Sequence, residues 1–337
     1  MTTGPIDAVI TWVDGNDPEH QRKRTEALSG SSNRSMHTIP AGQAKTRFLD
    51  NGELQYCICS IRRFAPWIRY IHLITDNQIP AFLTASERTR LGVRIVDHRD
   101  IFASFEWALP TFNSRSIETA IWRTPELASR FIYFNDDFLI TRPVEPTDFF
   151  SAGKVVLRGE WKPLRNYGAV RIQLNRVLNF FTRNLLGVSH TMHLLLQARS
   201  AQLAGMKKEY FRAPHIPHPI RKETLEEFFR DHPETFAQNI SYPFRDIWQF
   251  SGIYLANHLE ILNRNVLFAD ETDSLMINGE LDLSTVVKKK LQKLHEGQEV
   301  TFLCLQSLEK LHDRQRVHLE KILKERLIAE SSTVSEH

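Results

Sequence analysis

Two adjacent carboxylates, Asp136 and Asp137, follow Asn135 at the end of the apolar stretch 131–134. Two neighbouring carboxylates are costly to bury without compensation. A divalent cation supplies that compensation, because Mg²⁺ commonly takes one or two protein carboxylates and completes its shell with phosphate oxygens. The segment therefore indicates a magnesium site facing a phosphorylated substrate. An exposed turn, in which Asn and Asp are common, is the alternative.

Three other segments carry side chains suited to phosphate chemistry. Trp12 and Asp14 open a polar loop after an apolar segment, as in a nucleotide pocket, although Asp-Gly-Asn is also ordinary turn chemistry. His215 lies on the proline-rich loop 214–219 and is a candidate general base near neutral pH. Arg245 has a guanidinium fork that suits phosphate recognition. The alternative for His215 is a structural or exposed histidine, and the alternative for Arg245 is a surface ion pair.

The cysteines and the charged C-terminal stretch favour structural interpretations. Cys57, Cys59 and Cys304 do not supply a four-ligand zinc site or a disulfide framework, so we expect free thiols in a reducing compartment. The basic run 288–290 and the apolar stripe within 308–323 fit a membrane surface or a partner. They fit equally a helix that packs on its own domain and turns its charged face to solvent.

Composition narrows the class of protein. The chain has 337 residues, of which 42% are hydrophobic and 25% are charged, so it is not disordered as a whole. A net charge of +3 does not argue for a nucleic-acid partner. We find no signal peptide at the N-terminus and no run of about 18 apolar residues that would span a membrane. The expected location is therefore cytoplasmic.

An apolar strand, a polar loop and then a helix recur through the first 150 residues. Strands are expected at 6–13, 68–75, 93–96 and 130–134. Helices are expected from Asp50, with Glu53 completing a capping box, and at 80–90 and 114–127, whereas 19–46 is expected to be a mobile polar excursion. This alternation predicts a doubly wound α/β sheet, in which ligands bind beyond the carboxyl ends of the strands. The Asp/Asn clusters at 14–17, 76–78 and 135–137 then converge on one crevice.

The order of the motifs resembles that of the Stealth family. The first blocks read IDAVITWVDGND, RFLDNGELQYCICSIRRFAPWIRYIHLITDNQIPAFL, LPTFNSRSIE and RFIYFNDDFLITRPVEPTDFF. The segments PHIPHPI and HPETFAQNISYPFRDIWQF are similar to the family's third conserved region. The segment TFLCLQSLEK resembles the family's fourth conserved region more faintly. The resemblance covers 6–17, 47–150, 214–262 and, weakly, 300–325. This family includes bacterial capsular-polysaccharide phosphotransferases and the catalytic part of the lysosomal-enzyme N-acetylglucosamine-1-phosphotransferase.

The resemblance implies a GT-A-like or Rossmann-like fold, mostly of parallel strands, with a mainly helical C-terminal part. It implies transfer of hexose-1-phosphate, in the first instance N-acetylhexosamine-1-phosphate, from a UDP-sugar to a sugar hydroxyl of a capsular or cell-surface polysaccharide, with release of UMP. The alternatives are a metal-dependent glycosyltransferase that releases UDP and a non-catalytic capsule-assembly subunit. The expected partners are the UDP-sugar donor, an oligosaccharide or polysaccharide acceptor and capsule-assembly machinery at the inner face of the membrane, with no nucleic acid.

The same resemblance assigns roles to residues and boundaries to domains. Asp136 and Asp137 would hold Mg²⁺ or Mn²⁺, His215 would act as base or phosphate ligand, and Arg245 would stabilise the transferring phosphoryl group. Other implied substrate-binding residues are Trp12, Asp14, Arg47, Asn51, Asp76, Asn77, Asn113 and Asn135. The implied parts are a nucleotide-sugar core (1–150), a helical acceptor-side insertion (151–213), the third region (214–270) and C-terminal helices (271–337).

Four residues depart from the family pattern. Ala120 and Trp122 stand where relatives often carry histidine, which leaves the donor or acceptor contacts there in doubt. Gln306 and Ser307 stand where the fourth region usually reads Asn-Asp, which weakens the role expected of that segment.

Overall fold

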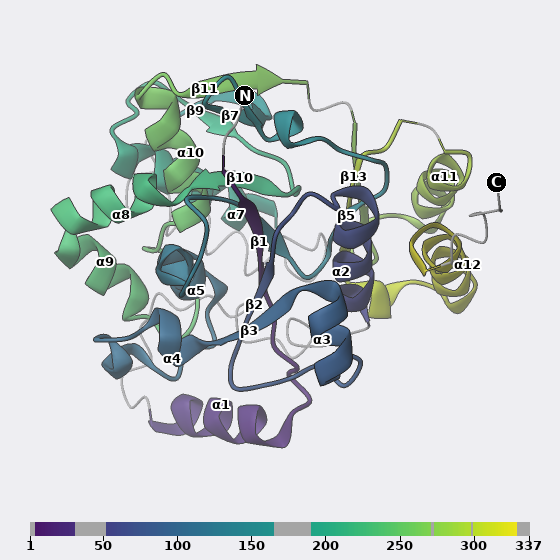
Figure 1. The fold of residues 1–337 in the computed structure, drawn as a ribbon, viewed down its shortest axis with the longest axis horizontal. Coiled ribbons are helices and arrows are strands. Elements are labelled where there is room, and N and C mark those ends of the chain that lie inside the picture. The colour runs from purple at the N-terminus through teal and green to yellow at the C-terminus, as the bar shows by residue number, and fades with distance from the viewer. Residues whose placement is uncertain (1–3, 31–51, 165–189, 271–272, 298, 329–337) are drawn as a thin grey trace, which may run out of the picture.

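The computed structural model describes residues 4–30, 52–164, 190–270, 273–297 and 299–328, and its centre is a five-stranded sheet (Figure 1). The strand order is β10-β4-β1-β2-β3, in which β10 is antiparallel and the other four strands are parallel. The order reverses between β1 and β4, so the predicted doubly wound α/β sheet is confirmed. The strands are β1 (Ile6–Thr11), β2 (Ile71–Thr75), β3 (Val93–Asp97), β4 (Arg130–Asn135) and β10 (His218–Arg221).

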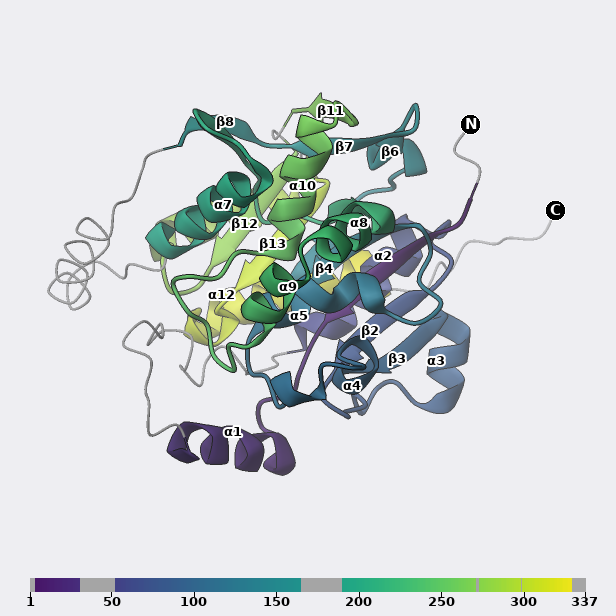
Figure 2. The ribbon, with the colours of Figure 1, turned by 90° about the vertical axis from the view of Figure 1, so that its left-hand side faces the viewer.

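Helices cover both faces of this sheet (Figure 2). Side chains alternate along a strand, so Ala8 and Ile10 of β1 pack toward one face and Val9 toward the other. The first face is covered by α2 (Glu53–Phe64) and α3 (Ala85–Leu91). The second is covered by α4 (His98–Ile101), α5 (Ser114–Ala120), α8 (Lys222–Asp231), α9 (Pro233–Ile240) and α10 (Gly252–Leu262).

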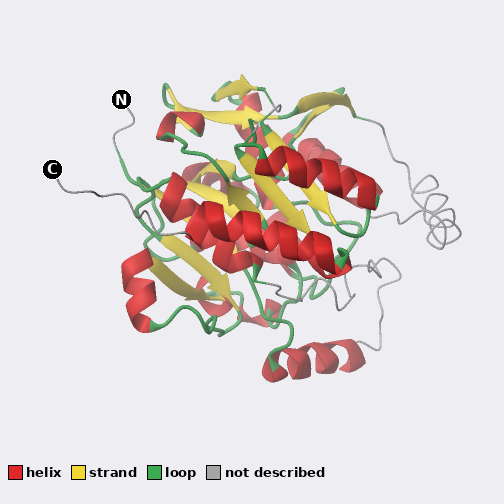
Figure 3. Ribbon diagram, turned by 90° about the vertical axis from the view of Figure 1, so that its right-hand side faces the viewer, coloured by secondary structure: helices red, strands yellow, loops and turns green. Residues whose placement is uncertain are grey.

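A second sheet joins the C-terminal part to the core (Figure 3). Its order is β12-β13-β5, and it carries a separate apolar cluster that includes Leu319, Ile322 and Leu323. The apolar C-terminal stripe therefore packs on its own domain, which confirms the second of the two interpretations of this segment. These elements are β5 (Phe138–Ile140), β12 (Ser274–Asn278), α11 (Ser284–His295), β13 (Phe302–Gln306) and α12 (Asp313–Leu323).

The part of the chain after residue 270, expected to be helical, contains strands β12 and β13 as well as helices α11 and α12. The run Phe302–Gln306 is a strand whose first four residues are buried, so it has no polar face to give an alternating pattern. Two small sheets, β11-β7-β6 and β8-β9, and helix α7 lie between residues 150 and 269, so the described part of the insertion 151–213, expected to be helical, contains strands as well as a helix. Their bounds are β6 (Phe150–Ser151), β7 (Lys154–Arg158), β8 (Glu160–Pro163), α7 (His190–Ala204), β9 (Glu209–Arg212) and β11 (Val266–Ala269).

Several expected boundaries are corrected. Residues 18–30 form helix α1 (Pro18–Gly30), not the start of a mobile excursion, and 31–46 lie outside the described residues. Helix α2 begins at Glu53 after Gly52, whose φ of 88° is left-handed, so the capping box from Asp50 is wrong. Helices α3 and α5 are both shorter than expected, since each is only 7 residues long.

The thiols and the helices agree with two expectations from the sequence. Cys57 and Cys304 are buried free thiols, and Cys59 is partly buried. Burial raises the pKa of both Cys57 and Cys304, which disfavours a reactive thiolate. Within the described ranges, no helix is long and apolar enough to cross a bilayer.

Asp7 joins β1 to its neighbours at the amino-terminal edge of the sheet. Its carboxylate is fully buried and accepts two hydrogen bonds from the Arg69 guanidinium, at 2.9 and 2.7 Å. It also accepts hydrogen bonds from the backbone amides of Ala128 at 2.9 Å and Tyr70 at 3.2 Å. His72 Nε2 lies 3.1 Å from the same carboxylate. Burial alone would raise the pKa of Asp7, but the contacts with Arg69, His72 and Ala128 outweigh it and hold the pKa well below its usual value.

We expect Asp7→Asn to lower the free energy of unfolding at pH 7 by about 3 kcal/mol, because an amide nitrogen cannot accept the hydrogen bonds that the buried carboxylate receives from Arg69 and from two backbone amides. A depressed folded-state pKa gives stability that is present above the unfolded-state pKa and is lost as the pH falls through the folded-state value. Urea unfolding between pH 7 and pH 3 should therefore show a steeper acid loss for the wild type than for the variant. Parallel pH curves for the two proteins would contradict this role.

Candidate active site

Asp136 and Asp137 lie where the chain leaves the central sheet and enters the second one. Strand β4 ends at Asn135, β5 begins at Phe138, and β5 pairs with β13 instead of with β4. The Leu305 amide donates to the Asp137 carbonyl at 3.0 Å, which holds the Asp pair against β13. The pair therefore sits at the carboxyl edge of β4, next to the reversal in strand order, where ligands bind in sheets of this kind.

The surroundings of Asp137 suit a cation. Its Oδ1 is buried and has no hydrogen-bond partner among the described residues, and the Cys304 thiol lies 3.8 Å from Oδ2. Burial and the negative charge of Glu53 raise the pKa of Asp137 to about 7, although the Cys304 and Gln306 side chains favour the ionised form. A buried carboxylate oxygen that accepts no hydrogen bond is suited to bind a cation.

The cation would need oxygens from elsewhere to complete its shell. In the parts of the chain that the structure describes, no three His, Cys, Asp or Glu side chains are grouped as a ready-made metal site. Mg²⁺ often binds proteins through one or two carboxylates, with substrate phosphates and water as the remaining ligands. Asp136 and Asp137 therefore fit a cation that arrives with a phosphorylated substrate.

Arg245 and Glu118 form a second charged pair in this crevice. Arg245 Nη2 donates to the Ser114 hydroxyl at 2.7 Å, and the Ser251 hydroxyl donates to Glu118. Burial lowers the pKa of Arg245, and the charges of Glu118 and Tyr133 oppose that shift. Burial raises the pKa of Glu118, and the Ser251 hydrogen bond and the charge of Arg245 oppose that shift. Each group therefore favours the ionised form of the other and opposes the effect of burial on it.

Tyr133 links this pair to the strand end. Its side chain is 2% exposed, and its hydroxyl donates to Asn135 Oδ1 at 2.6 Å and lies 3.0 Å from the Thr11 hydroxyl. The charges of Glu118 and of Asp136 both act on its pKa, so the three side chains occupy one electrostatic neighbourhood. Tyr133 thereby orients Asn135 and holds β1 and β4 together at the crevice.

The loop 241–251 carries Arg245 and is held in place by buried polar groups of α5. Asn113 is 1% exposed, and its Nδ2 donates to the Tyr242 carbonyl at 2.9 Å and to Gln249 Oε1 at 2.8 Å. Arg115 donates to the Asp246 carbonyl at 2.7 Å. Asn113 therefore positions the loop, and its side chain does not face the crevice.

His215 stands just before β10 and beside the Asp pair. Its ring centroid is 6.3 Å from that of Phe138, the residue that follows Asp137. His218, in contrast, is 4% exposed and pairs with Tyr133 in the sheet, and burial lowers its pKa to about 3. Of the two imidazoles on this proline-rich loop, His218 is therefore a buried residue of the sheet, whereas His215 is partly exposed.

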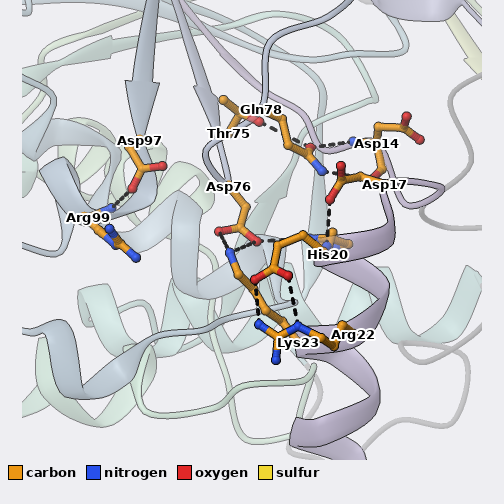
Figure 4. A network of polar contacts seen from close by, with 11 residues as sticks. Asp14, Asp17, His20, Arg22, Lys23, Thr75, Asp76, Gln78, Asp97 and Arg99 are labelled. Atoms are coloured by element: carbon orange, nitrogen blue, oxygen red, sulfur yellow. Dashed lines mark hydrogen bonds and ion pairs between the residues drawn. The ribbon is translucent and has the colours of Figure 1, made fainter.

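The loops after β1 and β2 meet one another at the same edge of the sheet (Figure 4). Gln78 Oε1 accepts from the Asp14 amide at 2.8 Å, and Gln78 Nε2 donates to the Asp14 carbonyl at 3.0 Å. Asp76 accepts hydrogen bonds from Lys23 at 3.0 and 3.2 Å and lies 3.2 Å from His20. Burial alone would raise the pKa of Asp76, but His20 and Lys23 outweigh it and hold the pKa low. Asp76 thus fastens α1 to the sheet.

The remaining predicted residues have mixed placements. Trp12 is 6% exposed and packs within the core, whereas Asn77 is exposed at a left-handed φ of 52°. Arg47 and Asn51 lie outside the described residues. The departures Ala120 and Trp122 pack in the apolar cluster beneath α5, where Trp122 stacks on Phe229 at 6.4 Å. Those two substitutions therefore do not alter the crevice itself.

Three side chains of the crevice were missed in the sequence. Glu118 lies within the block LPTFNSRSIE and in helix α5, and nothing in the sequence marks it as a residue that acts on Arg245. Glu53 was assigned to a capping box, but it is 8% exposed and acts on Asp137. Gln306 was treated as a weakened family position, yet it lies close enough to Asp137 to affect its pKa. A buried carboxylate has no local signature, so no pattern could have revealed these contacts.

Comparison with known proteins agrees with the motif order. Models of Stealth protein conserved region 1 and conserved region 2 match residues 4–32 and 47–157. The capsular polysaccharide phosphotransferase WcwK of Streptococcus pneumoniae is 30% identical over 276 residues, which are 75% of this chain and 78% of WcwK. The chain belongs to the Stealth family.

Other relatives of this Stealth protein are longer than the chain. The exopolysaccharide phosphotransferase CpsY of Mycobacterium tuberculosis is 34% identical over 304 residues, which are 89% of this chain and 52% of CpsY. An exopolysaccharide phosphotransferase of Streptomyces coelicolor is 35% identical over 73% of this chain and 41% of its own. The chain spans less than half the length of the Streptomyces coelicolor relatives that it matches. The crystal structure of the galactosyltransferase LgtC aligns over 98% of both chains with 10% identity and a TM-score of 0.43.

Proposed function

We propose that this Stealth protein transfers hexose-1-phosphate from a UDP-sugar to a hydroxyl of a capsular or cell-surface polysaccharide and releases UMP. The observation that carries the proposal is that the strand end with Asp136 and Asp137 lies beside His215 and is linked through Tyr133 to Glu118, whose charge acts on Arg245. Phosphoryl transfer needs alignment and neutralisation of charge more than covalent help, and two carboxylates with an arginine provide both. Similarity to capsular and exopolysaccharide phosphotransferases supports the same reaction class.

In this proposal Asp136 and Asp137 would hold Mg²⁺ or Mn²⁺, which neutralises charge on the donor diphosphate when bound. Arg245 binds the oxygens of the β-phosphoryl group and stabilises the charge that develops on them. Ser114 and Glu118 orient the guanidinium through the contacts described above. Asn135 and the β1–β2 loops bind the remainder of the nucleotide-sugar.

The reaction forms one bond and breaks one bond. The acceptor oxygen attacks the β-phosphorus, and the bond from that phosphorus to the bridging oxygen of the α-phosphate breaks, so UMP leaves with the bonding electron pair. His215 takes the proton of the acceptor hydroxyl, a step that a positioned base typically accelerates by about 10²–10⁴-fold. The product is a phosphodiester between two sugars.

The nucleotide that is released tests this proposal. We expect incubation of the purified protein with Mg²⁺ or Mn²⁺, a panel of UDP-sugars and capsule-type oligosaccharides to yield UMP from one donor, and EDTA to abolish the release. Release of UDP would instead show attack at the anomeric carbon, which is the reaction of a glycosyltransferase. Absence of turnover with every donor would favour a non-catalytic subunit of capsule assembly.

A further inference from the structure

A partly exposed tryptophan lies beside an arginine at the edge of the crevice. Trp248 is 45% exposed and stands three residues after Arg245 on the loop 241–251. The guanidinium carbon of Arg199, from α7, lies 4.5 Å from the centroid of the Trp248 ring. Within the described part of the chain, Arg199 has no hydrogen bond or ion pair, and its Nε is buried without an acceptor. Its cation–π contact therefore leaves most of its hydrogen-bonding capacity unused.

Buried hydrogen bonds join this pair of side chains to the catalytic crevice. Ser200, next to Arg199, accepts from the Ser251 amide at 3.0 Å and donates to the Ser251 carbonyl at 3.2 Å. Ser251 in turn donates its hydroxyl to Glu118. Helix α7 is therefore fixed against the loop at the residue that contacts the charged pair.

A hydrogen bond within the loop fixes the backbone at Trp248. The Trp248 amide donates to Asp246 Oδ1 at 2.9 Å, and Asp246 is 1% exposed. Three residues of chain span at most about 11 Å, so Trp248 lies within one or two sugar units of Arg245. The pair thus has a fixed position relative to the group that would contact the transferring phosphoryl group.

The chemistry of the pair matches a charged sugar polymer. The flat face of an indole offers a large apolar surface with one polar edge, which suits the C–H face of a sugar ring. The charge of Asp246 opposes the effect of burial on the pKa of Arg199, but no hydrogen bond or ion pair between the described residues occupies the guanidinium, so it retains donors for a phosphate oxygen pair. A polymer whose sugars are joined by phosphodiesters presents both features in alternation.

We propose that Trp248 and Arg199 form an acceptor subsite, in which Trp248 stacks on a sugar ring of the growing chain and Arg199 binds the adjacent phosphodiester. The subsite rests on the proposed function, because a phosphodiester-linked polymer is the product of that reaction. It binds the acceptor beyond the reacting sugar, so it sets acceptor affinity and leaves the chemical step unchanged.

Binding measured without donor tests the subsite independently of the reaction. The probes are a tetramer of N-acetylhexosamine joined by phosphodiesters and a neutral N-acetylhexosamine tetramer, titrated by calorimetry. We expect Trp248→Ala to weaken binding of both tetramers by about tenfold and Trp248→Phe to restore most of it. Arg199→Gln should weaken binding of the charged tetramer by about tenfold and leave the neutral one unchanged.

A matched control is available in Trp107, which is 60% exposed and contacts the Phe105 ring at a centroid distance of 6.5 Å. Trp107→Ala should leave the affinity for both tetramers unchanged. In turnover assays, Trp248→Ala should raise the KM for acceptor while kcat and the KM for donor stay as in the wild type.

Three results would overturn the subsite: wild-type protein that binds neither tetramer, unchanged affinity in Trp248→Ala, or equal loss for both tetramers in Arg199→Gln. The last result would show that Arg199 only supports the ring. If the binding results hold but UDP is released, the subsite stands and the proposed phosphoryl transfer fails. If UMP is released but the binding results fail, the reverse applies.

Discussion

Asp137→Asn should lower turnover by at least about 10³-fold, the scale of loss when a principal electrostatic group is removed from a transition state. The same change should leave the melting temperature equal to or above that of the wild type. Burial and the charge of Glu53 raise the pKa of Asp137 to about 7, so the ionised carboxylate is a cost to the folded state when no cation is bound. A neutral amide removes that cost.

Two measurements separate a cation ligand from a structural residue. Addition of Mn²⁺ should raise the melting temperature of the wild type, because a ligand that binds only the folded state stabilises it, and this rise should be lost in Asp137→Asn. Asp231→Asn is the matched control, since Asp231 is exposed on α8 and, among the residues that the structure describes, pairs only with its neighbour Arg230 at 3.4 Å. Full activity in Asp137→Asn would eliminate the proposed cation site.

Arg245→Ala should lower kcat by about 10²–10³-fold, and Arg245→Lys should recover little of the loss. A lysine keeps the charge but cannot contact two phosphate oxygens in one plane while also donating to Ser114, as Arg245 does at 2.7 Å. Removal of the guanidinium also takes away a charge that opposes the effect of burial on Glu118. The pKa of Glu118 should therefore rise further in Arg245→Ala.

The expected rise in the pKa of Glu118 provides a pH-dependent test of the role of Arg245. The Glu118 carboxyl group should ionise over a higher pH range in Arg245→Ala than in the wild type, and NMR titration of its side-chain carboxyl carbon measures this difference. The comparison is made with Arg230→Ala on the exposed surface of α8, whose profile should match the wild type. Arg245→Ala with a wild-type kcat would show that the guanidinium is structural.

Local patterns in the sequence were enough to predict the sheet and the edge where the site lies. Each parallel strand is an apolar run that stops at polar residues, and burial on both faces makes such runs nearly continuous. Because the carboxyl ends of parallel strands share one edge, the Asp pair after β4 and the loops after β1 and β2 had to lie along it. The free thiols followed from the number and spacing of the cysteines.

Residue roles that depend on a partner distant in the chain were not predictable in the same way. Asp76 stands at the expected edge, but Lys23 and His20 use its carboxylate to fasten α1. Asn113 was expected at the nucleotide-sugar and instead holds the loop that carries Arg245. In both cases residue type and strand position were informative, whereas the orientation of the side chain depended on its partner.

The sequence by itself predicted the four parallel strands of the central sheet and the chemical groups that follow them, because these depend on short-range periodicity and turn residues, but it did not predict the antiparallel strand β10. Only the tertiary structure decided that Glu118 faces Arg245, that Glu53 and Cys304 flank Asp137, and that Arg199 lies against Trp248. These pairs join segments whose separation in the chain carries no local signal. Strand register and helix packing bring them together, and both are set by burial of the whole apolar surface at once.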